Sequence, residues 1–291
     1  MSADEVLSEQ RVELPGGPQL ALRRGTGDPG RRPFLLVHGL ASNARLWDGV
    51  ATALVAAGRE VAAVDLRGHG RSGTTPDGHS TDGAAADLAA LCELLGWTGR
   101  RAPVVAGQSW GGNVVLTVAA RHPGVVAAVA CIDGGWLFFG DRFADFESCW
   151  RAMAPPTFDG VRWSDVVGWI SREHSDWSQQ AIDGALANLV ELPDGGVRNR
   201  LAREHHRDIV HSLWTDDPRA LYPLVDVPVL LMPAGAEADS RHAGAVREAL
   251  AALPRARVSW YAGADHDLHA QHPHRAADDL LALDAWASEP Q

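Results

Sequence analysis

The sequence predicts an α/β protein with a mostly parallel, doubly wound sheet and a helical cap inserted after the sixth strand. Three observations lead to this prediction. Short apolar runs recur along the chain, amphipathic helical patterns separate them, and one long aromatic-rich stretch interrupts the alternation. Strands that alternate with helices are typical of a parallel sheet that is covered on both faces.

The predicted strands are short and continuously apolar, as expected where both faces of a strand are buried. An opening hairpin at 11–24 turns at Pro15-Gly16-Gly17. The later runs lie at 34–37, 61–64, 104–106, 126–132, 227–232 and 258–261. Helical patterns lie between the runs, at about 43–57, 82–96, 111–122, 241–252 and 272–287.

The alternation stops between Gly134 and about Pro218, where we expect no strand. This stretch holds six of the eleven tryptophans and five of the six phenylalanines, and its residues 197–214 have a helical pattern. We therefore predict a core domain made of 1–135 and 216–291, with a helical cap at 136–215.

The aromatic side chains of the predicted cap are candidates for substrate binding. Tryptophan and phenylalanine bury a large apolar area, so they suit a pocket for an apolar small molecule. We expect Trp136, Phe139 and Trp214 to contact the substrate, while other rings in this stretch pack the cap against the core.

Composition and charge exclude several classes of function. The chain of 291 residues fits one large domain with an insertion. Its net charge of −11, without a basic stripe, argues against binding to nucleic acid or to an anionic membrane. The sequence has no lysine, which excludes Schiff-base chemistry, pyridoxal phosphate anchoring and a lysine-bearing phosphate loop.

The remaining bulk features predict a cytoplasmic protein without a metal site. Cys92, Cys131 and Cys149 lack metal-ligand spacing. The acidic N-terminus does not resemble a signal peptide, and no apolar run approaches the ~18 residues of a membrane span. The expected partner is a small-molecule substrate. The oligomeric state stays open, a homo-oligomer included.

The strongest motif is Gly107-Gln108-Ser109-Trp110-Gly111, between a predicted strand and an apolar helix. A serine on a sharp turn from strand to helix needs small neighbours, because the backbone is strained and the helix passes close by. Such a turn lifts the hydroxyl above the sheet beside backbone N–H groups. Ser109 is therefore the candidate nucleophile.

A second motif, His38-Gly39-Leu40, closes the predicted strand 34–37. We interpret it as part of an oxyanion hole, in which the N–H groups of Leu40 and Trp110 meet the developing negative charge. Losing one such donor typically costs about 3–4 kcal/mol in the transition state. The plainer alternative is a loop that carries a buried histidine.

A serine hydroxyl needs a base to take its proton, and His266 is the candidate among thirteen histidines. It lies in a loop after the last predicted strand, in the chain order of serine, acid and histidine. His269, His272 and His274 are expected to begin a helix and face solvent. His205, His206 and His211 lack the accompanying carboxylates of a metal site.

The segment 68–73 fits the pattern G-x-G-x-x-G after a strand and thereby mimics a dinucleotide-binding fingerprint. Turn residues follow it instead of a helix, so no helix N-terminus would meet a pyrophosphate. We therefore expect a structural turn here and no cofactor.

Together, HGL at 38–40, DLRGHGRS at 65–72, GQSWGG at 107–112 and GADHDLHAQHP at 263–273 resemble the motifs of α/β-hydrolase-fold enzymes. The resemblance covers about 11–287. It implies Ser109 as nucleophile, His266 as base, and Leu40 and Trp110 as oxyanion donors.

The acid departs from the pattern of that family. The position at which most relatives carry an aspartate is Ala238, flanked by Glu237 and Asp239. Asp133 competes with them, because some hydrolases of this fold take their acid from the preceding strand. We favour Asp133 and keep Glu237 and Asp239 as alternatives.

The expected function is hydrolysis of an ester, lactone or thioester of a mostly apolar small molecule through an acyl-enzyme on Ser109. Two alternatives stay open. One is other cofactor-free chemistry on the same fold, such as carbon–carbon bond hydrolysis, aminopeptidase cleavage or perhydrolysis. The other is a non-catalytic receptor for a small ligand.

Overall fold

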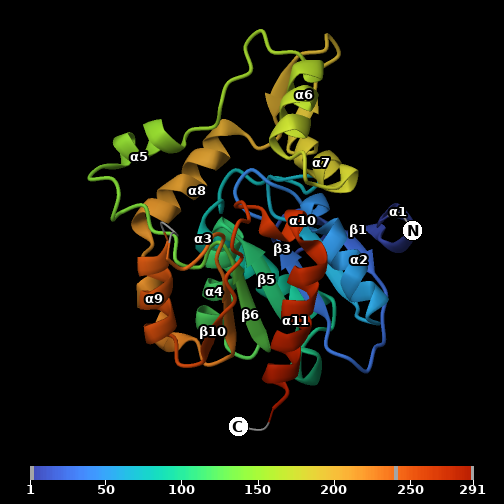
Figure 1. Cartoon of the computed structure of the whole chain (residues 1–291), viewed down its shortest axis with the longest axis vertical. Helices are drawn as coiled ribbons and strands as arrows, with labels where there is room; N and C mark the ends of the chain where they lie inside the picture. The colour runs from blue at the N-terminus through green and yellow to red at the C-terminus, as the bar shows by residue number, and fades with distance from the viewer. Residues whose placement is uncertain (1–2, 239–241, 290–291) are drawn as a thin grey trace.

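The computed structural model describes residues 3–238 and 242–289, and a central sheet runs through them (Figure 1). Its strands are β1 (Ser8–Glu13), β2 (Gln19–Gly25), β3 (Phe34–Val37), β4 (Val61–Asp65), β5 (Val104–Gln108), β6 (Ala128–Ile132), β9 (Val229–Met232) and β10 (Ala256–Val258). The eight strands follow the order β1-β2-β4-β3-β5-β6-β9-β10. β1 pairs antiparallel with β2 and β2 with β4, while the others pair parallel.

Helices cover both faces of this sheet, as the sequence predicts. They are α1 (Ala3–Val6), α2 (Asp48–Ala56), α3 (Thr81–Leu94), α4 (Trp110–Arg121), α9 (Ala243–Ala252), α10 (Leu268–Gln271) and α11 (Pro273–Ala287). Four 3-10 helices join them, η1 (Ala44–Trp47), η2 (Gly99–Arg101), η3 (Pro218–Ala220) and η4 (Tyr222–Leu224). α2 and α11 pack on one face, and α3, α4 and α9 on the other.

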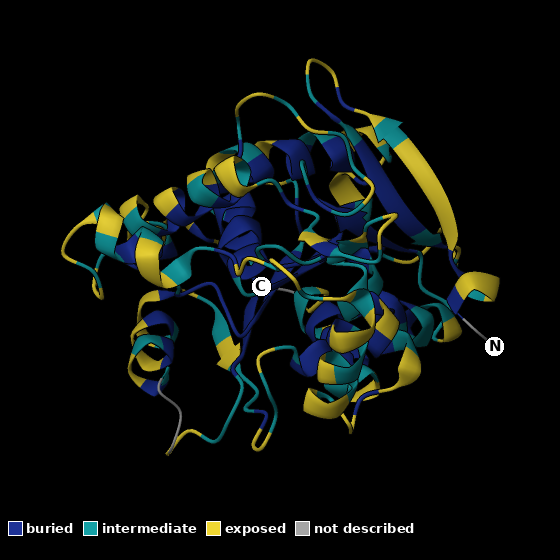
Figure 2. Ribbon diagram, turned by 90° about the horizontal axis from the view of Figure 1, so that it is seen from above, coloured by how far each residue is buried: buried dark blue, intermediate teal, exposed yellow. Residues whose placement is uncertain are grey.

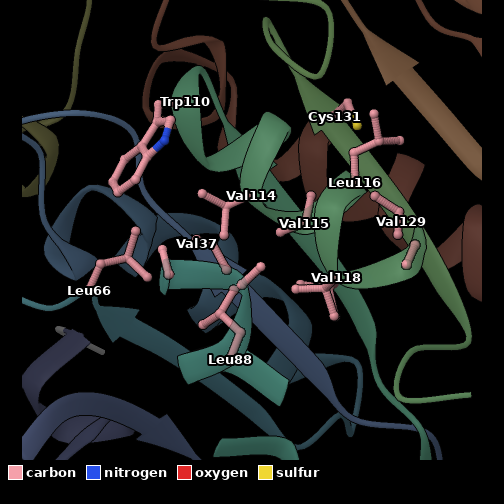
Figure 3. Close-up of a cluster of buried hydrophobic side chains, with 14 of the residues drawn as sticks. Val37, Leu66, Leu88, Trp110, Val114, Val115, Leu116, Val118, Val129 and Cys131 are labelled. Carbon is pink, nitrogen blue, oxygen red and sulfur yellow. The ribbon is translucent and has the colours of Figure 1, made fainter. Parts of the chain in front are cut away.

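Alternate residues of a strand belong to different cores. In β3, Leu35 and Val37 belong to the core that α3 and α4 cover (Figure 3), whereas Phe34 and Leu36 pack with α2 and α11. Each of these four side chains is 0% exposed. Figure 2 shows the same contrast, with buried residues in the sheet and exposed ones on the edge strand β1 and the outer helix faces. Burial on both sides explains the unbroken apolar run.

Between β6 and β9 the chain leaves the sheet. It forms α5 (Phe146–Met153), α6 (Trp163–Glu173), α7 (Gln179–Leu186), β7 (Leu189–Glu191), β8 (Val197–Asn199) and α8 (Arg203–Thr215). These helices lie in the upper part of Figure 1, beyond the end of the sheet, as two pairs, α5 with α8 and α6 with α7. The segment contacts the core directly, because Asn43 Nδ2 donates to the carbonyl of Gly184 at 2.8 Å.

Three predicted elements differ from the structure. The prediction of no strand between Gly134 and Pro218 is wrong, because β7 and β8 form a small antiparallel hairpin. Strands of three residues are too short to produce a periodic pattern. For the same reason the helix predicted at 197–214 is wrong at its start, since β8 occupies 197–199 and α8 begins at Arg203. The last strand ends at Val258 instead of Tyr261.

Within the described residues, no helix combines the length and the apolar character that crossing a membrane requires.

The double-sided burial of β3 leads to a stability prediction. Replacing Leu36 by Ala should lower the free energy of unfolding by about 2–5 kcal/mol, because the cavity opens in a fully packed core. Leu94 in α3 is 49% exposed, so Leu94→Ala is the matched control and should stay within about 0.5 kcal/mol of wild type. Chemical denaturation measures both. Equal losses in the two variants would contradict the assignment of Leu36 to a packed core.

Candidate active site

Ser109 joins β5 to α4 in a strained conformation. Its backbone has φ 54° and ψ −123°, and a non-glycine residue in a sparsely populated region costs of order 1–3 kcal/mol. Two hydrogen bonds hold the turn, from Ser109 N to the carbonyl of Ile132 at 2.8 Å and from Gly112 N to the carbonyl of Ser109 at 2.9 Å. The strand-to-helix turn around the serine has the form that the sequence predicts for a nucleophile.

Glycines allow three pieces of backbone to meet at this serine. A Cβ atom on Gly107 would lie 2.1 Å from the carbonyl oxygen of Gly111, and one on Gly134 would lie 2.0 Å from that of Ser109. A Cβ on Gly39 would lie 2.9 Å from the Cβ of Ser109. The loops after β3 and β6 therefore both contact the turn directly.

Asp133 and His266 form a hydrogen-bonded pair beside this turn. Asp133 directly follows β6, with φ 41° and a side chain that is 3% exposed. Its Oδ2 lies 2.6 Å from His266 Nδ1, and its Oδ1 accepts from Ala234 N at 3.1 Å. Gln108 Nε2 donates to the carbonyl of His266 at 3.2 Å, which ties the histidine loop to the residue before Ser109. The imidazole is 46% exposed.

The structure describes one of the two alternative acids. Glu237 is exposed, and its Oε1 lies 3.8 Å from Nη1 of Arg247. Asp239 lies outside the described residues. The structure brings Asp133 to His266, as the sequence analysis favours, and leaves the exposed Glu237 paired with Arg247.

The two predicted oxyanion donors flank the serine. Leu40 follows Gly39, which packs on Ser109, and Trp110 is the first residue of α4. Among residues 3–238 and 242–289, neither backbone N–H donates to a protein acceptor. Both groups are therefore available to a ligand oxygen.

The side chain of Trp110 is anchored in the core. It is buried at the start of α4, next to Leu66 and Val114 in Figure 3. Its Nε1 donates to Thr81 Oγ1 at 3.0 Å, and Thr81 Oγ1 lies 2.9 Å from Ser212 Oγ in α8. This chain of polar contacts links the turn to the segment between β6 and β9.

A buried histidine shapes the oxyanion loop. His38 Nδ1 lies 2.7 Å from the carbonyl of Gly39, and Leu66 N donates to His38 Nε2 at 3.0 Å. Because Nε2 accepts, Nδ1 carries the proton and the ring is neutral. Burial lowers the pKa of His38, which agrees with this neutral state. His38 thus has a structural role, and His266 is the partly exposed histidine of the site.

The prediction that His269 faces solvent is wrong. The residue lies in the short helix α10, is 1% exposed and packs on Trp47 with 4.2 Å between ring centroids. Neither ring nitrogen has a hydrogen-bond partner within the described part of the chain. Burial therefore lowers the pKa of His269 to about 3. The local sequence does not reveal this burial, because it depends on packing against Trp47, which is far away in the chain.

The three predicted substrate-binding aromatics are held by contacts within the protein. Trp136 and Phe139 are buried and line a cavity of about 200 Å³ whose lining residues include neither Ser109 nor His266. Trp214 Nε1 donates to the carbonyl of Phe143 at 3.0 Å. All three rings thus make contacts within the protein.

Trp177, in the segment between β6 and β9, contacts the loop that carries His266, and the sequence did not predict this contact. Trp177 Nε1 donates to Asp265 Oδ2 at 3.1 Å, next to His266. The two residues are 88 positions apart, and neither belongs to a motif that pairs them. The aromatic richness of the segment was the only available signal.

No group of three or more His, Cys, Asp or Glu side chains that could hold a metal ion occurs in the part of the chain that the structure describes.

The order of the strands and the serine turn after β5 define a class of protein, the proteins with an α/β-hydrolase fold. The family model for the alpha/beta hydrolase fold matches residues 32–273. The chain belongs to this family, which confirms the fold that the sequence predicts.

Individual relatives carry several names. The chain is 30% identical over 262 residues to a non-heme haloperoxidase of Rhodococcus erythropolis, covering 87% of this chain and 92% of the relative. It is 36% identical over 177 residues to the lipase LipV of Mycobacterium tuberculosis, covering 60% and 62%. Among solved structures, E-2-(acetamidomethylene)succinate hydrolase superposes with a TM-score of 0.78 at 22% identity, covering 95% of this chain and 98% of that one.

The close contact of Gly134 with the serine turn can be tested. Gly134→Ala should lower the free energy of unfolding by about 1–3 kcal/mol, because the new methyl group overlaps the carbonyl of Ser109. Gly244 in α9 is the matched control, since a Cβ there would meet no atom within 4 Å. Gly244→Ala should be neutral or stabilising by up to about 1 kcal/mol. Chemical denaturation that finds Gly134→Ala as stable as Gly244→Ala would argue against the contact.

The burial of His269 predicts a pH dependence of stability. Its pKa falls from 6.5 to about 3 on folding, so the neutral ring stabilises the fold fully above pH ~6.5 and less as the pH falls toward 3. Below pH ~6 this group should contribute a slope of about 1.4 kcal/mol per pH unit to the free energy of unfolding.

His269→Phe, which cannot take up a proton, should make that slope shallower by about the same amount between pH ~6 and ~4.5. Denaturation curves of both proteins across this range give the two slopes. Identical slopes would mean that the folded protein accommodates the protonated ring.

Proposed function

We propose that the protein is a serine hydrolase that cleaves an ester, lactone or thioester of a mostly apolar small molecule. The observation that carries the proposal is the 2.6 Å contact between His266 and Asp133 beside the strained turn of Ser109. The names of the relatives, a lipase and a haloperoxidase among them, support an enzyme of the hydrolase class.

In the proposed mechanism His266 is the general base. Asp133 accepts the hydrogen bond from Nδ1, which leaves Nε2 to take the proton of the Ser109 hydroxyl. The carboxylate then stabilises the imidazolium without taking its proton. Because Asp133 is buried and fixed by a second hydrogen bond from Ala234 N, it can orient the ring firmly.

The serine oxygen attacks the carbonyl carbon, and the C=O bond opens to an oxyanion. The N–H groups of Leu40 and Trp110 would donate to this oxyanion, and they are free of protein acceptors in the described residues. The tetrahedral intermediate collapses, His266 gives its proton to the leaving alcohol or thiol, and an acyl-enzyme remains on Ser109. Water, deprotonated by His266, then releases the acid and restores the serine.

We also propose that residues 136–215 act as a cap over this site. Two contacts support the idea, from Trp177 to Asp265 beside the histidine and from Asn43 beside the oxyanion loop to Gly184. Such a cap would exclude water and supply apolar walls.

Perhydrolysis is a second candidate. A similarity of 39% identity over 95 residues to a bifunctional esterase/perhydrolase of Acinetobacter calcoaceticus, covering 33% of each chain, favours it. Hydrogen peroxide would replace water as the nucleophile on the acyl-enzyme. Its oxygen would bond to the acyl carbon as the bond to Ser109 breaks, which releases a peroxy acid and returns the proton to the serine through His266. The same residues carry out both reactions.

A variant series tests the catalytic assignment. Ser109→Ala should abolish hydrolysis of p-nitrophenyl esters and of a thioester and lactone panel. Asp133→Asn should lower kcat by about a hundredfold or more, because the imidazole loses its orientation and charge partner. Glu237→Gln is the matched control and should retain nearly wild-type kcat, since its side chain is exposed and pairs with Arg247.

Labelling with a fluorophosphonate separates an enzyme from a receptor on the same fold. Mass spectrometry should find the adduct on Ser109 in the wild type and none in Ser109→Ala. Peroxy acid measured with and without hydrogen peroxide distinguishes the second candidate. An unlabelled wild type, or full activity in Asp133→Asn, would refute the proposed triad.

A further inference from the structure

A separate cavity of about 190 Å³ lies between the β1–β2 hairpin and the segment that connects β6 to β9. Asn43 and Arg45 line it beside the hairpin, and Ala187 and Arg200 come from the connecting segment. Neither Ser109 nor His266 is among its lining residues. The cavity is therefore distinct from the candidate active site.

Positive charge is concentrated in this cavity, although the whole chain carries a net charge of −11. Arginines outnumber carboxylates in its lining. The arginines are Arg11, Arg23, Arg45, Arg71 and Arg200, and the carboxylates are Glu9 and Asp65.

The two carboxylates already have partners. Asp65 accepts from Ala44 N through Oδ1 at 2.7 Å and from Arg71 N through Oδ2 at 2.8 Å. Glu9 forms an exposed ion pair with the guanidinium of Arg71. Arg23 is paired in a similar way, because its guanidinium forms an ion pair with the buried Asp48.

The other three arginines have no such partner among the described residues. Arg11 is exposed and donates from Nη1 to Gln19 Oε1 at 2.8 Å and to the carbonyl of Arg71 at 3.2 Å.

Arg45 and Arg200 are less exposed. Within the described residues, neither guanidinium has a carboxylate at ion-pair distance, and Arg45 Nε is buried without a hydrogen-bond partner. Arg200 donates from Nε to the carbonyl of Ala187 at 2.9 Å and from Nη2 to that of Leu189 at 3.2 Å, which fixes its plane. Burial lowers the pKa of Arg200, and the nearby charge of Asp65 opposes this effect.

We propose that the cavity binds a small organic oxyanion, the phosphate or carboxylate group of a metabolite-sized molecule, between Arg45 and Arg200. A guanidinium with a fixed plane suits these anions, because its parallel N–H groups match two oxygens. The volume is below that of pockets for drug-sized ligands, so the site fits a compact anionic group.

The position of the two arginines gives the anion a structural effect. Arg45 lies in η1, just after the oxyanion loop, and Arg200 follows β8 in the connecting segment. A bound anion would neutralise both charges and hold the two parts of the chain together. Because it binds the folded state, it should also raise the apparent stability with increasing concentration.

Calorimetric titration at constant ionic strength tests the site, with inorganic phosphate and succinate as the two probes. We expect saturable binding of at least one probe, and the preferred one identifies the anion class. Arg45→Met and Arg200→Met should each weaken binding by about tenfold or more, because each removes a charge-assisted contact. Arg200→Lys keeps the positive charge but loses the parallel N–H groups of the guanidinium. It provides a second variant if Arg200→Met does not fold.

Arg198→Met is the matched control. Arg198 is exposed on β8, two residues from Arg200, and does not line this cavity, so binding should be unchanged. Ser109→Ala should also bind the anion normally, which keeps this test independent of the catalytic proposal. No saturable binding of either probe up to about 10 mM, or equal weakening in Arg198→Met and the two cavity variants, would overturn the proposal.

Discussion

The left-handed backbone of Ser109 is the constraint on which the site depends. A side-chain-bearing residue with φ 54° between a buried strand and a buried helix is stable only if its surroundings hold it there. The surroundings are backbone atoms, because Gly107 and Gly134 lack the Cβ atoms that would separate the neighbouring segments from the turn. Gly107 in the motif and Gly134 after β6 therefore allow the close packing that holds the serine turn.

Sheet order explains why residues that are far apart in the chain meet. Ser109 and Asp133 each follow one of two adjacent parallel strands, and both have positive φ. Their side chains therefore leave the same edge of the sheet. His266 comes from a loop after the last strand and reaches Asp133 at 2.6 Å. The two strands are packed on both faces, so the positions of the serine and the acid depend on the core as a whole.

Much of this arrangement could be predicted from local sequence, and the rest depends on distant contacts. Apolar strands that are buried on both faces leave unbroken runs, and the strained serine leaves its glycines. The choice among Asp133, Glu237 and Asp239 was open in the sequence, because a hydrogen bond across 133 positions has no local signature. The burial of His269 against Trp47 was hidden for the same reason.

The bond between Asp133 and His266 has an evolutionary consequence. With the acid directly after β6, the proposed triad needs no side chain from the loop that follows β9. The backbone N–H of Ala234 at the start of that loop holds Asp133, whereas Glu237 further along it is exposed. Natural drift and laboratory libraries can therefore vary the loop beyond Ala234 in length and composition while Asp133 stays in place. Sequence changes in this part of the loop would alter which substrates reach the site without removing a side chain of the proposed triad.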